Sequence, residues 1–255
     1  MFPALARLLL PFATLLLLGL AGSPTASATS PFPMIETFQG ATVPSDWHFG
    51  GDAALTGASG GVDDGGLGWL RLTPALNGKF GYAFNDQAFD SSLGLVANFD
   101  YAMWGGLSFF LFDGVTTAGS FVPGALGAGL GYASCPTSMT PGVSNAYAGV
   151  GLDSWGNFTN PSTCGLTGLS AGLHPNLIAV RGGAPGYSYI TSAGVLSGKS
   201  LVTTRPNAQH VTVTLMPDGK MSVYLRYADG TLQTVMSGVQ MPTAPGTLKL
   251  GFGGA

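Results

Sequence analysis

Charged side chains are scarce in this sequence. Lys and Arg number nine and Asp and Glu twelve, or 8 % of 255 residues, and Glu36 is the single glutamate. With no basic stripe to neutralise phosphates, we expect no nucleic-acid partner. A glycoside hydrolase needs two carboxylates facing one groove. No predicted strand carries acidic residues two positions apart, the spacing that places both on one face, so we expect no enzyme.

Long apolar runs are also absent, apart from one at the N-terminus. The run Leu8–Leu20 follows Arg7 and precedes Ala26-Ser27-Ala28. It is shorter than the roughly 20 residues that span a bilayer, and the small residues resemble a cleavage site. We interpret residues 1–28 as a signal peptide, with a transmembrane anchor as the alternative. The prediction is a secreted or cell-surface protein with no membrane span in residues 29–255.

Cysteine is limited to Cys135 and Cys164. Two cysteines alone cannot form a tetrahedral zinc site, and no histidine lies at zinc-finger spacing. An even pair in an exported chain favours a disulfide over two buried free thiols. The cysteines flank a predicted strand from Tyr147 to Asp153, so a bridge would join the loops on either side of it.

Glycine, in contrast, is abundant, with 41 residues. This content indicates short strands joined by tight turns, because glycine adopts the positive φ that such turns require. Asp218-Gly219 and Asp229-Gly230 separate alternating runs and predict a three-strand meander. No segment after the signal peptide has helical periodicity, and Gly50–Gly66 is predicted to be a surface loop. We therefore predict one all-β domain over residues 29–255, with strands at Gly68–Thr73, Gly81–Phe84, Leu93–Tyr101, Leu107–Phe112, Tyr147–Asp153, Val211–Leu215, Met221–Tyr227, Thr231–Met236 and Thr247–Phe252.

The segment Ala148–Asn160 carries the most informative set of polar side chains. A strand of small and apolar residues delivers Asp153 into a loop with Trp155, Asn157 and Asn160. Carboxylate, carbonyl and amide oxygens are the ligands calcium prefers. An indole can stack on the apolar face of a pyranose, and an amide can bond its hydroxyls. The alternative is a polar turn that caps its own backbone.

The sequence resembles the L-type (legume-type) lectin family, particularly its bacterial members. The resemblance extends from about Phe38 to the end of the chain. It implies a concanavalin A-like jelly-roll β-sandwich of antiparallel sheets. The segments that carry it, in order, are Gly105–Gly114, Gly124–Ala133, Gly149–Pro161, Pro175–Gly182 and Gly246–Phe252.

Position by position, the resemblance assigns roles to several residues. Calcium ligands would be Asp153, the Trp155 carbonyl, Asn157 and Asn160. Sugar contacts would be the Trp155 ring, Asn157 and a backbone donor at Gly127 or its neighbour Gly129.

Several positions depart from the family pattern. Gly151 stands where a metal-binding Glu is usual, Asn160 replaces a second Asp, and Thr163–Leu169 contains no histidine. One carboxylate cannot balance two divalent cations, so we expect no transition-metal site and weak or absent calcium binding. The sugar-orienting Asp is also missing, since Trp104-Gly105 occupies its turn. Trp104 is then either a stacking surface or a buried structural residue.

The family usually has another strand after Phe252. We therefore expect the last strand to be missing or a sheet edge to be open. The resemblance predicts a secreted, non-catalytic carbohydrate-binding domain with a degenerate metal site. The alternatives are a structural or adhesive surface domain that has lost sugar binding and, third, a glycoside hydrolase with an unrecognised site. The sequence does not specify the oligomeric state.

Overall fold

The computed structural model describes residues 32–255, so the predicted signal peptide lies outside the described residues. The chain forms short strands joined by turns, and its helical parts are one turn of α-helix, α1 (Pro161–Cys164), and five short 3-10 turns in the described part. The strands are β1 (Trp47–Gly51), β2 (Ala54–Leu55), β3 (Leu70–Arg71), β4 (Gly81–Asp90), β5 (Leu95–Tyr101), β6 (Gly106–Asp113), β7 (Ala146–Asp153), β8 (Leu177–Gly182), β9 (Tyr189–Gly194), β10 (Gln209–Leu215), β11 (Lys220–Arg226), β12 (Leu232–Gln240) and β13 (Thr247–Gly254).

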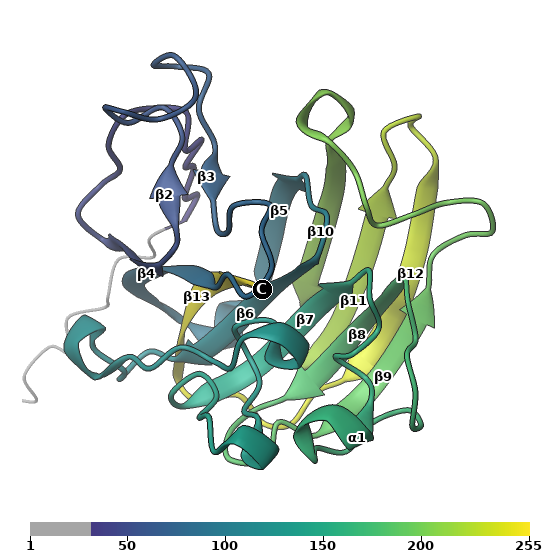
Figure 1. Cartoon of the computed structure of the whole chain (residues 1–255). Helices are drawn as coiled ribbons and strands as arrows, with labels where there is room; N and C mark the ends of the chain where they lie inside the picture. The colour runs from purple at the N-terminus through teal and green to yellow at the C-terminus, as the bar shows by residue number, and fades with distance from the viewer. Residues whose placement is uncertain (1–31) are drawn as a thin grey trace, which may run out of the picture.

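Two antiparallel sheets of unequal width form a sandwich (Figure 1). The seven-stranded sheet has the order β1-β4-β13-β6-β7-β8-β9, and the four-stranded sheet has the order β12-β11-β10-β5. A small hairpin of β2 and β3 stands apart from both. The all-β, antiparallel prediction is confirmed, and the Asp-Gly turns join β10 to β11 and β11 to β12 as predicted.

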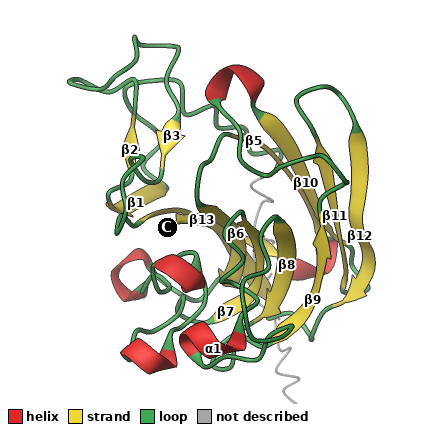
Figure 2. Ribbon diagram, turned by 45° about the vertical axis from the view of Figure 1, so that its right-hand side comes forward, coloured by secondary structure: helices red, strands yellow, loops and turns green. Residues whose placement is uncertain are grey.

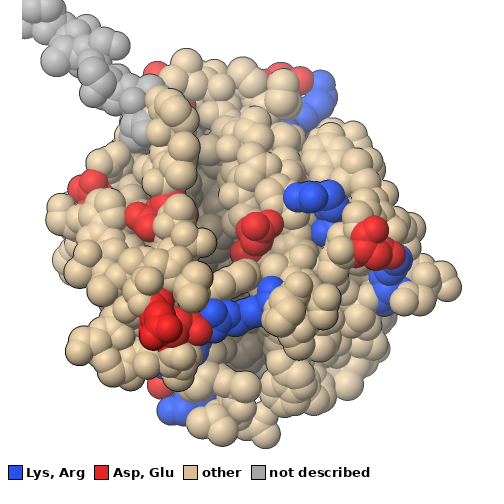
Figure 3. All heavy atoms as spheres, turned by 90° about the horizontal axis from the view of Figure 1, so that it is seen from above, with Lys and Arg blue, Asp and Glu red and all other residues tan. Residues whose placement is uncertain are grey.

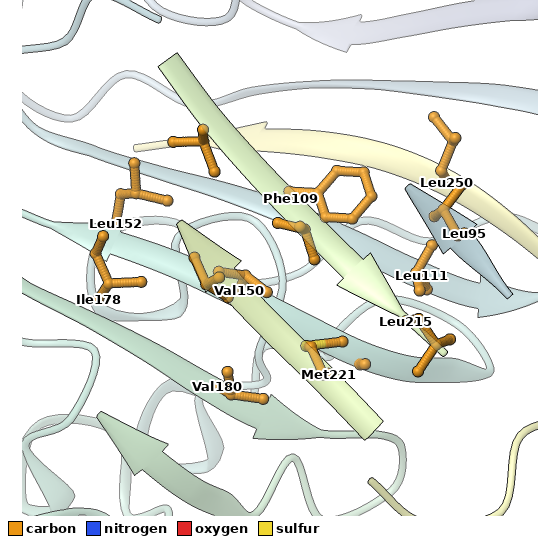
Figure 4. Packing of buried hydrophobic residues seen from close by; sticks show 14 of the residues in the cluster. Leu95, Phe109, Leu111, Val150, Leu152, Ile178, Val180, Leu215, Met221 and Leu250 are labelled. Atoms are coloured by element: carbon orange, nitrogen blue, oxygen red, sulfur yellow. The ribbon is translucent and has the colours of Figure 1, made fainter. Parts of the chain in front are cut away.

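The main core lies between the two sheets. Alternate residues of β10, such as Val211 and Val213, are buried, and Phe109 of β6 faces them from the other sheet. Figure 4 shows this interface, with Leu95, Leu215 and Met221 of the four-stranded sheet packed against residues of the seven-stranded sheet. Period-two burial on β10 follows from the alternation of side chains along a strand.

A second core covers the outer face of the seven-stranded sheet. Phe110 and Phe112 of β6 point to this face, where they pack with Tyr132 and Phe158. Loops that connect β6 to β7 and β7 to β8 supply the cover, and their short helical turns gather on this side in Figure 2. Strand β6 is therefore buried on both faces, which explains why its sequence is almost continuously apolar.

Because the four-stranded sheet is the narrower one, its edge strand β5 lines an open cavity. The cavity has a volume of about 1800 Å³ and runs from Met34–Gln39 past Leu72–Asn77 and β5 to the loops that carry Trp104 and Trp155. Val96 on β5 is 62 % exposed. Strand β5 is one edge of the four-stranded sheet, and β12 is the other. The last strand, β13, pairs with β4 and β6 and is interior to its sheet.

Several local predictions from the sequence were wrong. The predicted loop Gly50–Gly66 contains the end of β1 and all of β2, and the predicted strand Gly68–Thr73 shrinks to β3. The strands β1, β2, β8 and β9 were not among the predicted strands. In the structure β1 pairs with β4, and β8 pairs with β7 and β9. The helix α1 begins at Pro161, with Asn160 as its N-cap.

Candidate functional site

Asp153, the last residue of β7, organises the loop that follows the strand. It is 2 % exposed, and its two carboxylate oxygens accept hydrogen bonds from the Trp155 N–H at 2.9 Å and the Phe158 N–H at 2.6 Å. Each oxygen therefore accepts one hydrogen bond from the backbone of the same loop. This is the capping arrangement that sequence analysis left open as the alternative to metal binding.

Trp104 and Trp155 meet above this loop. Their rings lie edge to face with centroids 5.6 Å apart, and the side chains are 54 % and 53 % exposed. Ser154 holds the two segments together, because its hydroxyl donates to the carbonyl oxygens of Trp104 at 3.0 Å and Gly105 at 2.6 Å. Trp104 is thus a surface aromatic residue, which decides between the two interpretations of this position.

The glycine-rich loop presents Gly127, and not Gly129, to the cavity. Gly127 is exposed and has φ +63°, with no atom within 4 Å of the place where a Cβ would lie. Its N–H makes no hydrogen bond within residues 32–255. Gly129 is buried, and its N–H donates to the Leu126 carbonyl at 3.5 Å. Only the first of the two predicted backbone donors is available to a ligand.

The two asparagines of the loop have different surroundings. Asn157 is half-buried, lines the cavity and accepts a hydrogen bond from the Thr163 hydroxyl at 3.3 Å. Asn160 does not line the cavity, and its side-chain oxygen accepts from the Ser162 N–H at 3.0 Å and the Gly172 N–H at 3.3 Å. The structure therefore brings Asp153, Trp155, Asn157 and Gly127 to one cavity, together with Trp104, and leaves Asn160 and Gly129 outside it.

Arg181 of β8 supports this loop from beneath and was not singled out by sequence analysis. It is 2 % exposed and donates to the carbonyl oxygens of Phe158, Thr167 and Tyr187. Its guanidinium also lies over the Phe158 ring, 4.9 Å from the centroid. Burial lowers the pKa of Arg181 to about 10. In the sequence, the position of Arg181 within the apolar run of β8 could have indicated a buried cation. The carbonyl groups that it bonds could not be identified from the sequence.

The cavity that holds the tryptophan pair is lined mainly by uncharged residues, with six acidic or basic side chains among them: Glu36, Arg71, Asp100, Asp153, Arg205 and His210. Figure 3 views the molecule from above and shows a hollow in its surface with acidic and basic side chains around it. Asp153, two residues before Trp155, lines this cavity, and its carboxylate accepts two backbone N–H bonds. A site of this kind suits a neutral polar ligand with an apolar face.

The candidate metal ligands do not fit a calcium ion. Calcium takes six to eight oxygen ligands, with carboxylates prominent among them. Here one carboxylate is present, both of its oxygens accept N–H bonds, and the Asn160 oxygen accepts two more. Residues 32–255 contain no group of three His, Cys, Asp or Glu side chains placed to hold a metal.

Ser170 and His174 form a second polar pair, near Gly156. The residues Gly168–Gly172 match the G-x-S-x-G pattern, and the Ser170 hydroxyl lies 3.0 Å from His174 Nε2. The same nitrogen is 3.2 Å from the Ser170 carbonyl oxygen, and no carboxylate in the described residues contacts the ring. The segment lies in bends and turns, without the strand-to-helix turn of a nucleophile elbow. The pair lacks the third member that a hydrolase triad requires.

Cys135 and Cys164 form the predicted disulfide, which is confirmed. The bridge joins the loop before β7 to the end of α1, so it fixes the cover of the second core next to the site.

Comparisons with known proteins identify the fold of the chain. No protein-family model matches the chain, and no curated protein matches its sequence. Among solved structures, peanut lectin with a nine-residue peptide has a TM-score of 0.54 at 17 % identity, covering 85 % of this chain and 87 % of the lectin. The exoplasmic/lumenal domain of VIP36, in its Ca²⁺- and Man3GlcNAc-bound form, has a TM-score of 0.54 at 14 % identity, covering 86 % of this chain and 82 % of that domain.

The chain has the L-type lectin fold. The metal-free form of lectin I-B4 from Griffonia simplicifolia agrees, with a TM-score of 0.52, 16 % identity and coverage of 86 % and 90 %. The resemblance noted in the sequence is therefore confirmed for the fold. Within the L-type lectin fold, the tryptophan pair lies at one end of the seven-stranded sheet, where β6 begins and β7 ends. In residues 32–255 no helix is long and apolar enough to span a membrane.

Proposed function

We propose that this chain is a secreted, non-catalytic carbohydrate-binding domain that binds sugar without a metal ion. The observation that carries the proposal is the exposed Trp104–Trp155 pair, which shares one cavity of an L-type lectin fold with the free Gly127 N–H. A pyranose ring would stack on one indole and receive its polar contacts from Gly127 and Asn157.

Metal independence rests on how the loop is held. In a calcium-dependent site the ion would shape the loop, whereas here Asp153 bonds the backbone N–H groups of Trp155 and Phe158. The hydrogen bonds of Arg181 to the Phe158 and Thr167 carbonyls fix the loop from the other side. The protein's own side chains therefore supply the rigidity that sugar binding requires.

Export follows from the N-terminal sequence and is part of the proposal. The Leu8–Leu20 run and Ala26-Ser27-Ala28 favour a cleaved signal peptide, and the Cys135–Cys164 bridge suits an oxidising compartment. The partner would be a glycan or glycoconjugate outside the cytoplasm. Without a charge-assisted contact to the sugar, the dissociation constant for a monosaccharide would be near the millimolar range. This corresponds to a binding free energy of about 4 kcal/mol in magnitude.

A glycan array of the full chain, run with calcium and again with a chelator, tests the proposal. We expect the same glycans to bind in both conditions. Trp155→Ala should weaken binding about tenfold, or about 1.4 kcal/mol. Leu232→Ala, at a similarly exposed apolar residue on β12, is the matched control and should leave binding unchanged.

Three outcomes would contradict this proposal. Loss of binding on chelation would mean that an ion shapes the loop. An absence of binding in both conditions would favour a structural or adhesive domain, a function that the internally bonded Asp153 and Asn160 side chains also suit. Hydrolysis of an oligosaccharide by the pure protein would contradict the non-catalytic assignment.

A further inference from the structure

The outer face of the four-stranded sheet carries a charged row that the proposed sugar site does not use. His210 of β10 lies directly between Asp100 of β5 and Arg226 of β11 in the strand register. All three alternate with buried neighbours, so their side chains point away from the core. Directly opposed side chains on neighbouring strands lie within contact distance of one another.

The members of this row differ in how they are bonded. His210 Nδ1 lies 2.7 Å from the Asp100 carboxylate, which fixes the imidazole on the sheet. The guanidinium of Arg226 has no hydrogen-bond or ion-pair partner in residues 32–255. Arg226, His210 and Asp100 line a depression of about 220 Å³, closed at its far end by the turn Tyr227–Gly230. Asp229, in the same turn, forms an ion pair with Lys199.

A second row, of uncharged side chains, lies beside the first. It consists of Asn98, Thr212 and Tyr224, again in register across β5, β10 and β11. The Asn98 side-chain oxygen accepts from the Thr212 hydroxyl at 2.7 Å, so the Asn98 amide N–H groups remain available. The Tyr224 hydroxyl is also unbonded within the described residues. These groups can donate to or accept from sugar hydroxyls, and Tyr224 adds an aromatic ring.

We propose that this face is a second ligand site, for a saccharide that carries a carboxylate. Arg226 binds the carboxylate through its planar fork, the arrangement that favours guanidinium over ammonium for such groups. Asn98 and Tyr224 bond the hydroxyls of the same ligand.

Calorimetric titration of the full chain with short oligogalacturonides tests this site. We expect saturable binding that is at least tenfold tighter than binding of an uncharged oligosaccharide of the same length or of acetate. Arg226→Gln should weaken it about tenfold. Lys220→Gln removes one positive charge from the same strand, where Lys220 pairs only with Asp218, and should change affinity less than about twofold.

Three results would overturn the proposal: no saturable binding, equal losses in Arg226→Gln and Lys220→Gln, or equal affinity for acetate. Asn98, Asp100 and His210 also line the large cavity that holds the tryptophan pair, whereas Arg226 and Tyr224 do not. A Trp104→Ala/Trp155→Ala variant should therefore bind oligogalacturonide as the wild type does, even if the first site binds no sugar.

Discussion

Replacement of Arg181 by methionine tests how the site loop is held. Arg181 supplies the only hydrogen bonds made to the carbonyl oxygens of Phe158, Thr167 and Tyr187 in the described structure. The methionine side chain would fill a similar volume and leave these three acceptors buried and unbonded. Each orphaned group costs about 1–3 kcal/mol, and part of this is offset because a buried cation is removed. We expect a net loss of about 3–5 kcal/mol in the free energy of unfolding.

Urea denaturation at neutral pH, followed by tryptophan fluorescence, measures this loss. Arg226→Met is the matched control, because Arg226 is exposed and has no partner in the described residues, and should change the free energy of unfolding by less than about 0.5 kcal/mol. Arg181→Lys keeps the charge but not the planar guanidinium. Its loss in the free energy of unfolding should therefore fall between those of Arg181→Met and Arg226→Met. If Arg181→Met loses less than about 1 kcal/mol, the three carbonyls are satisfied by other means and the argument is refuted.

Other expected effects follow from single contacts. Cys135→Ser/Cys164→Ser opens a loop with a sequence separation of 29 and should lower the free energy of unfolding by about 3–4 kcal/mol in thermal denaturation, whereas an unchanged melting temperature would contradict this. Gly156→Ala places a Cβ against backbone at φ +88° and should destabilise by about 2–3 kcal/mol, with sugar binding lost at lower temperature than in the wild type. The Lys199 ammonium lowers the pKa of Asp229 to about 2, so this pair contributes stability above the ordinary carboxyl pKa and loses it as pH falls through about 2. In Asp229→Asn, the free energy of unfolding should therefore depend less on pH between about 4 and 2.

The β-strands were predictable where local patterns are strong. Alternation at Val211–Leu215 and the Asp-Gly pairs at 218–219 and 229–230 predicted β10 to β12 correctly. These signals are local, since turn residues and the period of two depend on neighbours in the chain. The β1 strand escaped prediction because it pairs with β4, about 30 residues later in the chain. The β9 strand pairs with the preceding strand β8, but no Asn-Gly or Asp-Gly pair marks the turn between them.

The candidate site was only partly predictable. The sequence identified Asp153, Trp155 and Asn157, and the structure places all three at one cavity. It did not distinguish Gly127 from Gly129, because the difference is whether the N–H already bonds to another part of the loop. The sequence also did not decide whether Trp104 is exposed or buried. That depends on the hydrogen bond from Ser154, just after β7, to the Trp104 carbonyl, just before β6.

The sequence by itself determined the all-β class, the one disulfide available to two cysteines, and the nearly uncharged character of the molecule. Composition and short-range pattern suffice for these features, because they reflect turn chemistry and the burial of alternate side chains. Only the tertiary structure decided that Asp153 bonds its own loop, that Arg181 is buried against carbonyls, and that Asp100, His210 and Arg226 share one row. Polar groups bond whichever partners the folded chain brings within about 3 Å, and those partners lie on other strands and loops.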